Sequence, residues 1–139
     1  NTITFTTITV EVHLQDHNGD LIMTDDATVK YYSGGWRTLG NTVDGVATME
    51  MLPNNYNFRM YYQHTSHDQS QDINNDDTVL FQTGQVTSNS GNCTQYYAGG
   101  WRMFTNQMEL LPGDYTFRFN DGEPDTSNTI IEAMENHIH

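Results

Sequence analysis

Apolar and polar residues alternate along several short stretches of the chain, most clearly near its start. From Ile8 to Leu14 every second residue is apolar, and the residues between them are polar. A period of two predicts a β-strand with one buried face. The alternation changes phase between Phe5 and Ile8, so we predict two successive strands joined at residues 6–7. The same reasoning predicts strands over residues 28–32, 46–52, 56–61 and 78–81.

Two phrases of the sequence occur twice. Residues 31–37 read Tyr-Tyr-Ser-Gly-Gly-Trp-Arg, and residues 96–102 match them at six of the seven positions. Residues 49–53 return in similar form as residues 108–112, and each copy is soon followed by a Tyr-x-Phe-Arg sequence. Because internal repeats outweigh other sequence signals, we predict two related units in tandem.

A third phrase marks the boundaries of these units. It closes the first copy at residues 77–83, is matched by residues 128–133 in the second copy, and also opens the chain at residues 1–7. We therefore predict an all-β fold of tandem antiparallel β-sandwich domains. Residues 1–7 form a separate strand, residues 8–84 the first repeat, and residues 85–139 a shortened second repeat.

The second copy is shorter near its start. Twenty residues separate Val10 from Tyr31, whereas nine separate Val86 from Tyr96, a difference of about eleven. We expect these missing residues to form most of a two-strand hairpin in the first repeat. The second repeat is then truncated and exposes an unpaired sheet edge beside an apolar groove.

Composition restricts the partners and the compartment. Acidic residues outnumber basic ones by 18 to 5, for a net charge of −13, which excludes the nucleic-acid backbone as a partner. No apolar run is long enough to span a bilayer, and the single cysteine, Cys93, forms no internal disulfide. Abundant Thr, Asn, Gln and Ser suit a secreted β protein, so we expect an extracellular or cell-surface location. Asn92 begins an Asn-x-Thr pattern that accepts glycans.

No catalytic constellation emerges from the repeats, so we do not expect an enzyme, a cofactor or a metal site. Asp16, Asn18 and Asp20 resemble the start of a calcium loop, but the distal glutamate is missing and an Asx-stabilised turn explains them. Residues 64–77 contain two histidines and four aspartates without tetrahedral spacing, which favours a solvated loop over a metal site. His137 and His139 are metal-ligating residue types, but they lie at a terminus, where residues fray, so we do not expect a metal site there.

The aromatic residues of the repeated motif allow two interpretations. Trp36 and Trp101 are either buried in equivalent packing positions or form a platform on which a sugar ring stacks. The occurrence of the motif in both repeats favours packing, with Gly34 and Gly35 forming a bulge under Trp36. The arginines at repeat-equivalent positions are expected to bind carboxylates or aromatic rings: Arg37, Arg59, Arg102 and Arg118.

The order of phrases in residues 8–83 resembles a known family. An Asp-x-Asn-Gly turn, the Gly45-Val46 turn and the Leu52-Pro53-x-x-Tyr56 corner are similar to carboxypeptidase-regulatory-like and collagen-adhesin B-type repeats of bacterial surface proteins. The resemblance implies a prealbumin-like or immunoglobulin-like β-sandwich that serves as a spacer in exported proteins. Some repeats of this kind carry a Lys–Asn isopeptide bond whose lysine lies in the opening strand. Residues 9–15 contain no lysine, so we do not expect the bond here.

The opening phrase suggests how the protein assembles. Residues 1–7 copy a closing strand but precede the first repeat, and the second repeat is expected to lack strands. We therefore predict a head-to-tail homopolymer, a structural subunit of an extracellular filament or surface fibre, in which one copy donates a strand to the next. Two alternatives are that residues 1–7 pair within their own chain, and that the protein is a carbohydrate- or surface-binding module of a secreted adhesin. The expected donor residues are Thr2, Ile3, Thr4, Phe5 and Thr6, and the expected groove residues are Tyr96, Trp101 and Phe117.

Overall fold

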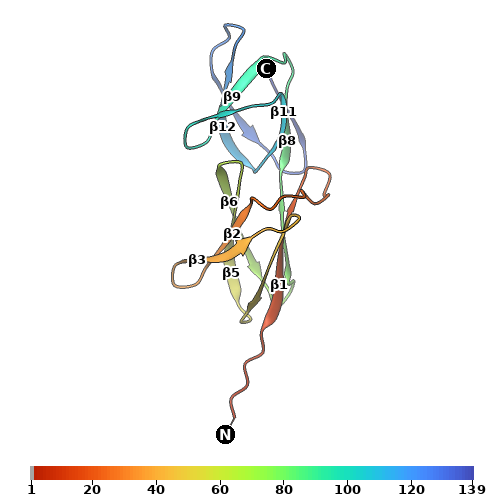
Figure 1. The fold of residues 1–139 in the computed structure, drawn as a ribbon, viewed down its shortest axis with the longest axis vertical. Coiled ribbons are helices and arrows are strands. Elements are labelled where there is room, and N and C mark those ends of the chain that lie inside the picture. The colour runs from red at the N-terminus through yellow and green to blue at the C-terminus, as the bar shows by residue number, and fades with distance from the viewer. Residues whose placement is uncertain (1) are drawn as a thin grey trace.

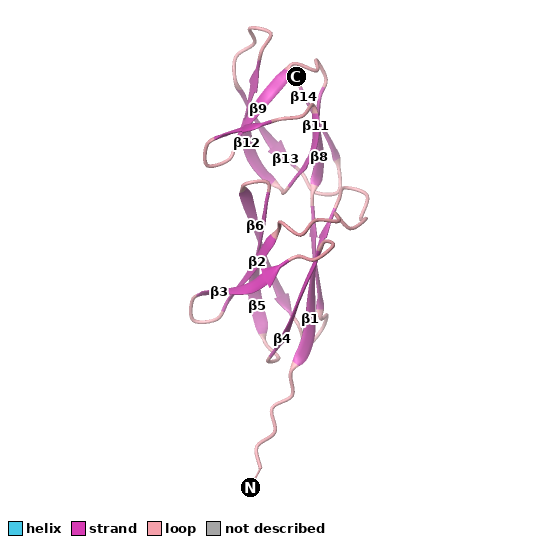
Figure 2. Ribbon diagram, viewed as in Figure 1, coloured by secondary structure: helices cyan, strands magenta, loops and turns pink. Residues whose placement is uncertain are grey.

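The chain forms an elongated, all-β molecule, which a computed structural model describes for residues 2–139 (Figure 1). Asn1, the first residue of the predicted donor segment, lies outside the described residues. Fourteen strands make up the regular structure of residues 2–139 (Figure 2). This part of the chain contains no helix that is long and apolar enough to cross a membrane.

Residues 8–82, termed the first unit, contain seven strands in two sheets. The three-stranded sheet has the order β4-β1-β7, and the four-stranded sheet has the order β3-β2-β5-β6. The strands are β1 (Ile8–Gln15), β2 (Thr28–Tyr32), β3 (Trp36–Asn41), β4 (Val46–Met51), β5 (Asn55–Tyr62), β6 (Thr65–Asp72) and β7 (Thr78–Gln82).

Residues 84–138, termed the second unit, contain the other seven strands. Their sheets have the orders β11-β8-β14 and β10-β9-β12-β13, which are the orders of the first unit with each strand number raised by seven. The strands are β8 (Gly84–Ser88), β9 (Cys93–Tyr97), β10 (Trp101–Met103), β11 (Gln107–Leu110), β12 (Gly113–Phe119), β13 (Thr126–Ile130) and β14 (Glu135–Ile138).

Alternating side chains place a hydrophobic core between the two sheets of each unit. On β1, Val10, Val12 and Leu14 are fully buried, which confirms the strand predicted from their spacing. The first core takes residues from both sheets of the first unit, and a separate cluster fills the second unit. The fold is therefore sandwich-like, as predicted. Two strand pairs, β1–β7 and β8–β14, are parallel, so the prediction of purely antiparallel sheets is wrong at these pairs.

The polar stretch predicted to be a solvated loop is mostly a strand. Residues 65–72 form β6, which pairs with β5 along its whole length. β6 lies at the edge of its sheet, and its alternate residues are only half-buried, so polar side chains are tolerated on both of its faces. The prediction missed the strand because hydrophobic alternation is absent there.

The prediction that the second repeat lacks a hairpin is wrong, because each unit has all seven strands. The difference in length lies in a connection instead. Residues 16–27 join β1 to β2, whereas only residues 89–92 join β8 to β9. Loop length changes a sandwich at little cost, so the second unit is shorter without being truncated in its sheets.

Two further local predictions are corrected by the structure. Residues 128–133, expected to close the second copy, include the end of β13, and β14 takes the place that β7 has in the first unit. Gly34 and Gly35 form the turn between β2 and β3 rather than a bulge, with φ of 65° and 147° and Ser33 N donating to Gly35 O at 2.9 Å. Apart from the chain neighbours of each glycine, no atom lies within 4 Å of a Cβ built on it.

Candidate functional site

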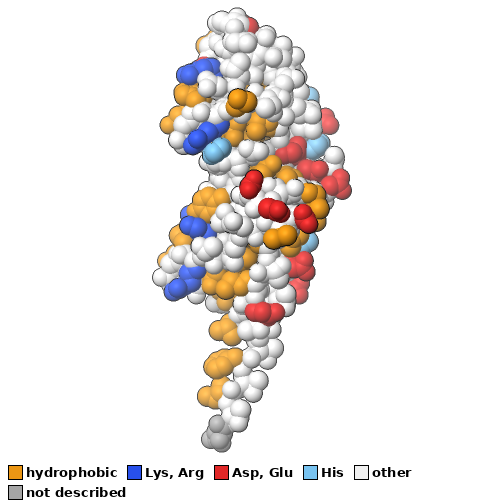
Figure 3. All heavy atoms as spheres, in the orientation of Figure 1, with side chains coloured by type: hydrophobic (Ala, Val, Ile, Leu, Met, Phe, Trp, Pro, Cys, Tyr) orange, Lys and Arg blue, Asp and Glu red, His pale blue; other side chains and the backbone are white. Residues whose placement is uncertain are grey.

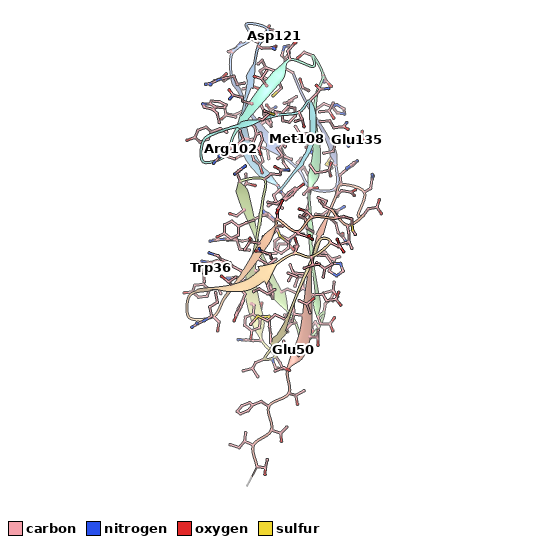
Figure 4. All side chains as sticks on the ribbon, viewed as in Figure 1. Trp36, Glu50, Arg102, Met108, Asp121 and Glu135 are labelled. Atoms are coloured by element: carbon pink, nitrogen blue, oxygen red, sulfur yellow. The ribbon has the colours of Figure 1, made fainter. Side chains whose placement is uncertain are left out.

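Residues 2–7 form an extended segment that projects from the body of the molecule along its long axis (Figure 1). The segment belongs to no sheet in the described structure. Ile3 and Phe5 are 78% and 75% exposed, and the residues around them are threonines. At its base, Thr7 Oγ1 donates to a carboxylate oxygen of Glu50 at 2.9 Å, and Figure 4 shows Glu50 at this end of the first unit.

The exposed segment resembles a buried strand in sequence. Residues 2–7 correspond to residues 78–83, which contain β7. In β7 the apolar positions Val79 and Phe81 are fully buried, and the strand pairs in parallel with β1. Ile3 and Phe5 occupy the corresponding positions of the exposed segment. The segment therefore has the pattern of a closing strand without a sheet to close.

The three expected groove residues do not line an open groove together. Tyr96 and Phe117 lie in the core of the second unit, with exposures of 1% and 0%. Trp101 lies half-buried on β10, at the edge of the four-stranded sheet. In the other sheet β14 pairs in parallel with β8, so the place beside β8 is occupied by the chain's own strand.

Trp36 belongs to a ladder of side chains on the outside of the first unit. The guanidinium carbon of Arg59 lies 3.9 Å from the centre of its ring, and Tyr32 meets it edge-on at 5.5 Å. Arg59 donates from Nε and Nη2 to both oxygens of Asp68, at 2.6 and 2.8 Å. These hydrogen bonds lower the pKa of Asp68, despite an opposing effect of burial. Trp36 is 37% exposed, so its neighbours cover most of the ring, but it lies on the surface and not in the core.

The second unit repeats this ladder. Arg118 lies 3.7 Å from the centre of the Trp101 ring, and Tyr97 meets the ring edge-on at 5.4 Å. Asp125 accepts from Arg118 Nη2 at 3.4 Å. The two tryptophans thus have equivalent neighbours, but β3 and β10 are edge strands on which only part of a large ring is covered.

Arg37 and Arg102 have a different role from the one predicted. Arg37 Nε donates to Ser33 O at 2.8 Å, and Arg102 Nε donates to Ala98 O at 3.0 Å. Each arginine therefore holds the hairpin turn of its own motif. Neither is part of an ion pair within residues 2–139. In the face shown in Figure 3, the Lys and Arg side chains lie along one side of the molecule and most Asp and Glu side chains along the other.

The two units meet at a junction that holds a half-buried carboxylate, Glu109 on β11. His17 donates its backbone N–H to Glu109 Oε1 at 2.7 Å, and His17 Nδ1 lies 3.1 Å from each carboxylate oxygen. Thr83 Oγ1 donates to the same oxygen at 2.9 Å. Thr83 is fully buried and is the only residue between β7 and β8. The sequence analysis did not identify this site, because its residues come from distant parts of the chain.

Apolar and tyrosine contacts complete the junction. Leu111, which follows β11, is fully buried and belongs to the core cluster of the first unit. The Tyr115 hydroxyl donates to Leu111 O at 2.7 Å and lies 3.0 Å from Thr65 Oγ1 of the first unit. The Tyr96 hydroxyl donates to Gln63 O across the junction at 3.0 Å. These contacts fix the position of one unit on the other.

The polar clusters noted in the sequence make local contacts. Asp16 Oδ1 accepts from the backbone N–H groups of Asn18 and Asp20 at 2.9 and 3.0 Å, which is an Asx-stabilised turn. Asp121 accepts from the Asn92 side chain at 3.2 Å and lies 2.9 Å from His139 Nε2, and the His139 contact lowers its pKa. Among the described residues no group of three or more His, Cys, Asp or Glu side chains is arranged to hold a metal ion.

Comparison of the chain with models of protein families, with curated proteins and with solved structures found no match.

Proposed function

We propose that the protein is a structural segment of an extracellular filament or surface fibre, built from two tandem copies of one β-sandwich domain that meet at Thr83. Copies assemble head to tail when residues 2–6 of one copy enter a sheet of the next. The observation that carries the proposal is the exposed segment 2–7, which has the apolar pattern of β7 and no sheet. An unpaired strand of this kind adds readily to a sheet of another molecule.

The junction supports a structural role. A single buried residue links β7 to β8, and hydrogen bonds from His17 and Thr83 converge on Glu109. Such a connection leaves little freedom for the units to bend, in contrast to a flexible linker. A stiff rod of stacked sandwiches suits a spacer or a fibre. The resemblance to repeats of bacterial surface proteins favours an extracellular location.

Matching sequences set the register of the donated strand. Residues 1–4 read Asn-Thr-Ile-Thr and residues 136–139 read Asn-His-Ile-His, so Ile3 matches Ile138 on β14. β14 buries one apolar side chain, Ile138, against the core, whereas residues 2–6 bring both Ile3 and Phe5. In the proposed assembly, residues 2–6 replace β14 beside β8 of the neighbouring copy. Since Ile3 takes the place of Ile138, Thr2 takes the place of His137. His137 pairs with Thr87 in the single chain, so Thr2 pairs with Thr87 of the neighbouring copy.

Cross-linking tests this register. In the variant Thr2→Cys/Thr87→Cys, we expect an intermolecular disulfide that yields a ladder of covalent oligomers under oxidising conditions. Parallel neighbours lie within the Cα separation that a disulfide requires. The matched control Thr6→Cys/Thr87→Cys is four residues out of register and should form few links. Burial raises the pKa of the native Cys93 thiol to about 11, so it competes little.

Deletion of residues 2–7 tests the function itself. We expect the intact protein to form fibres visible by electron microscopy and the shortened protein to remain monomeric. Fibres of normal length from the shortened protein would contradict strand donation. If both proteins are monomeric and bind to a glycan array through exposed Trp36, the second candidate function, a surface-binding module, replaces the first. The exposure of Tyr32, Trp36 and Tyr97, at 48%, 37% and 51%, is the observation that favours this second candidate.

A further inference from the structure

Residues 2–7 emerge from one end of the first unit. An exposed leucine, Leu52, lies at this end. Leu52 is the first residue after β4 and is 51% exposed. Its counterpart in the second unit is Leu111, because residues 49–53 and 108–112 are copies of one phrase. Leu111 is fully buried in the core cluster of the first unit. Of these two equivalent leucines, Leu111 is thus buried at the junction and Leu52 is exposed.

The local structure around the two leucines is the same. The Tyr56 hydroxyl donates to Leu52 O at 2.7 Å, just as the Tyr115 hydroxyl donates to Leu111 O at 2.7 Å. Both tyrosines therefore hold their loop by the same hydrogen bond. The loop at the exposed end of the first unit is therefore held in the same way as the loop that the second unit presents at the junction.

The carboxylates beside the leucines are also equivalent. Thr7 Oγ1 donates to Glu50 at 2.9 Å, and Thr83 Oγ1 donates to Glu109 at 2.9 Å. Hydrogen bonds from Thr9 and Thr7 lower the pKa of Glu50, so this carboxylate is charged at neutral pH. Glu109 has additional bonds from His17 of the other unit, and Glu50 has no such partner within residues 2–139. Within residues 2–139, this end of the first unit therefore has the features of a junction face and is covered by no other unit.

We propose that this end face, formed by Leu52, Glu50 and Tyr56, binds a second copy of the chain. It contacts the end of that copy's second unit that lies away from the junction, here called the far end. The two copies then meet in the same arrangement as the two units of one chain. The partner is a second copy because the contact that Leu111 makes is with a unit of this same fold, so the face continues an interface already present in the molecule. The inference rests on the proposed function, in which residues 2–6 from this same end enter that copy.

The far end of the second unit has an apolar position for Leu52 to cover. Phe119, at the end of β12, corresponds to Met60 of the first core, the cluster that includes Leu111. In the single chain the His139 ring, which follows β14, stacks on Phe119 edge-on at a centroid distance of 5.1 Å. When residues 2–6 replace β14, His139 leaves with it and uncovers Phe119. Strand entry and end-face docking therefore favour one another.

The test compares two exposed leucines with the same substitution. Leu52→Asp places a charge in the proposed interface, whereas Leu80→Asp changes a leucine on β7 that is 46% exposed and lies outside it. We expect Leu52→Asp to raise the concentration needed for assembly roughly ten-fold or more, as loss of a central apolar contact does. Leu80→Asp should assemble like the unmodified protein. Sedimentation velocity measures assembly, and thermal unfolding of the monomers verifies that both variants fold.

The outcomes separate this inference from the proposed function. If Leu52→Asp assembles at the unmodified protein's concentration while deletion of residues 2–7 abolishes assembly, the end face is not an interface and strand donation stands. If Leu52→Asp and Leu80→Asp weaken assembly equally, the effect is one of added charge and the inference is wrong. If the unmodified protein remains monomeric at high concentration, both proposals are wrong.

Discussion

Several residues of the two units come in pairs that share a local sequence and differ in their surroundings. Tyr56 and Tyr115 donate the same hydrogen bond to the same loop, but only Tyr115 also contacts a residue of the other unit. Burial raises the pKa of both hydroxyls, that of Tyr115 to about 12. The difference arises because the first unit packs against Tyr115 and removes water from it. The ionisation of one tyrosine therefore reports on the junction.

Stability should fall at high pH through Tyr115. Because its pKa is raised from 10.0 to about 12 in the folded protein, the neutral hydroxyl stabilises the fold fully below pH 10, and this contribution is lost as the pH rises through about 12. The difference between the two pKa values corresponds to about 3 kcal/mol. Tyr115→Phe loses about 1 kcal/mol of hydrogen bonding at neutral pH but does not ionise.

Urea unfolding at several pH values measures this effect. The unmodified protein should be the more stable at neutral pH, and Tyr115→Phe the more stable above pH 12. The comparison cancels the ionisation of the other tyrosines, which both proteins share. A constant difference between the two proteins from pH 9 to 12.5 would show that folding does not raise the pKa of Tyr115.

At the scale of elements, the short β11–β12 connection joins the two units into one body. It carries Leu111 into the first core, while β11 carries Glu109 to His17 and Thr83. The matching β4–β5 connection carries Leu52 into solvent. The same sequence element is thus buried at the junction in the second unit and exposed in the first unit.

Alanine substitutions distinguish the two connections. Leu111→Ala removes a fully buried side chain, so it should lower the free energy of unfolding by about 2–5 kcal/mol. Leu52→Ala should change it by less than about 0.5 kcal/mol in the monomer, since the side chain is half exposed. Denaturant unfolding of the monomeric proteins measures both. Equal effects would mean that Leu111 does not contribute to the first core in solution.

The sequence predicts those elements that are determined by the residue pattern of their own segment. Alternation at Val10, Val12 and Leu14 identified β1 because one face of that strand is buried by its own unit. β6 was missed because an edge strand can be polar on both faces. The surroundings of Leu52 and Leu111 could not be distinguished, since their local sequences agree and only the three-dimensional arrangement differs. The exposure of Trp36 was missed for the same reason, because it depends on the edge position of β3.

At the scale of the whole molecule, the order of strands determines how the rod responds to tension. In each unit the first and last strands, β1 with β7 and β8 with β14, are parallel neighbours. Pulling the two ends apart therefore slides these strands past each other and loads all their hydrogen bonds together, instead of opening them one by one. We expect the unfolding force in single-molecule pulling to be higher through the chain ends than across the sheet from β3 to β6, and similar forces would contradict this. A fibre of such units would bear mechanical load along its axis without a covalent cross-link between the strands.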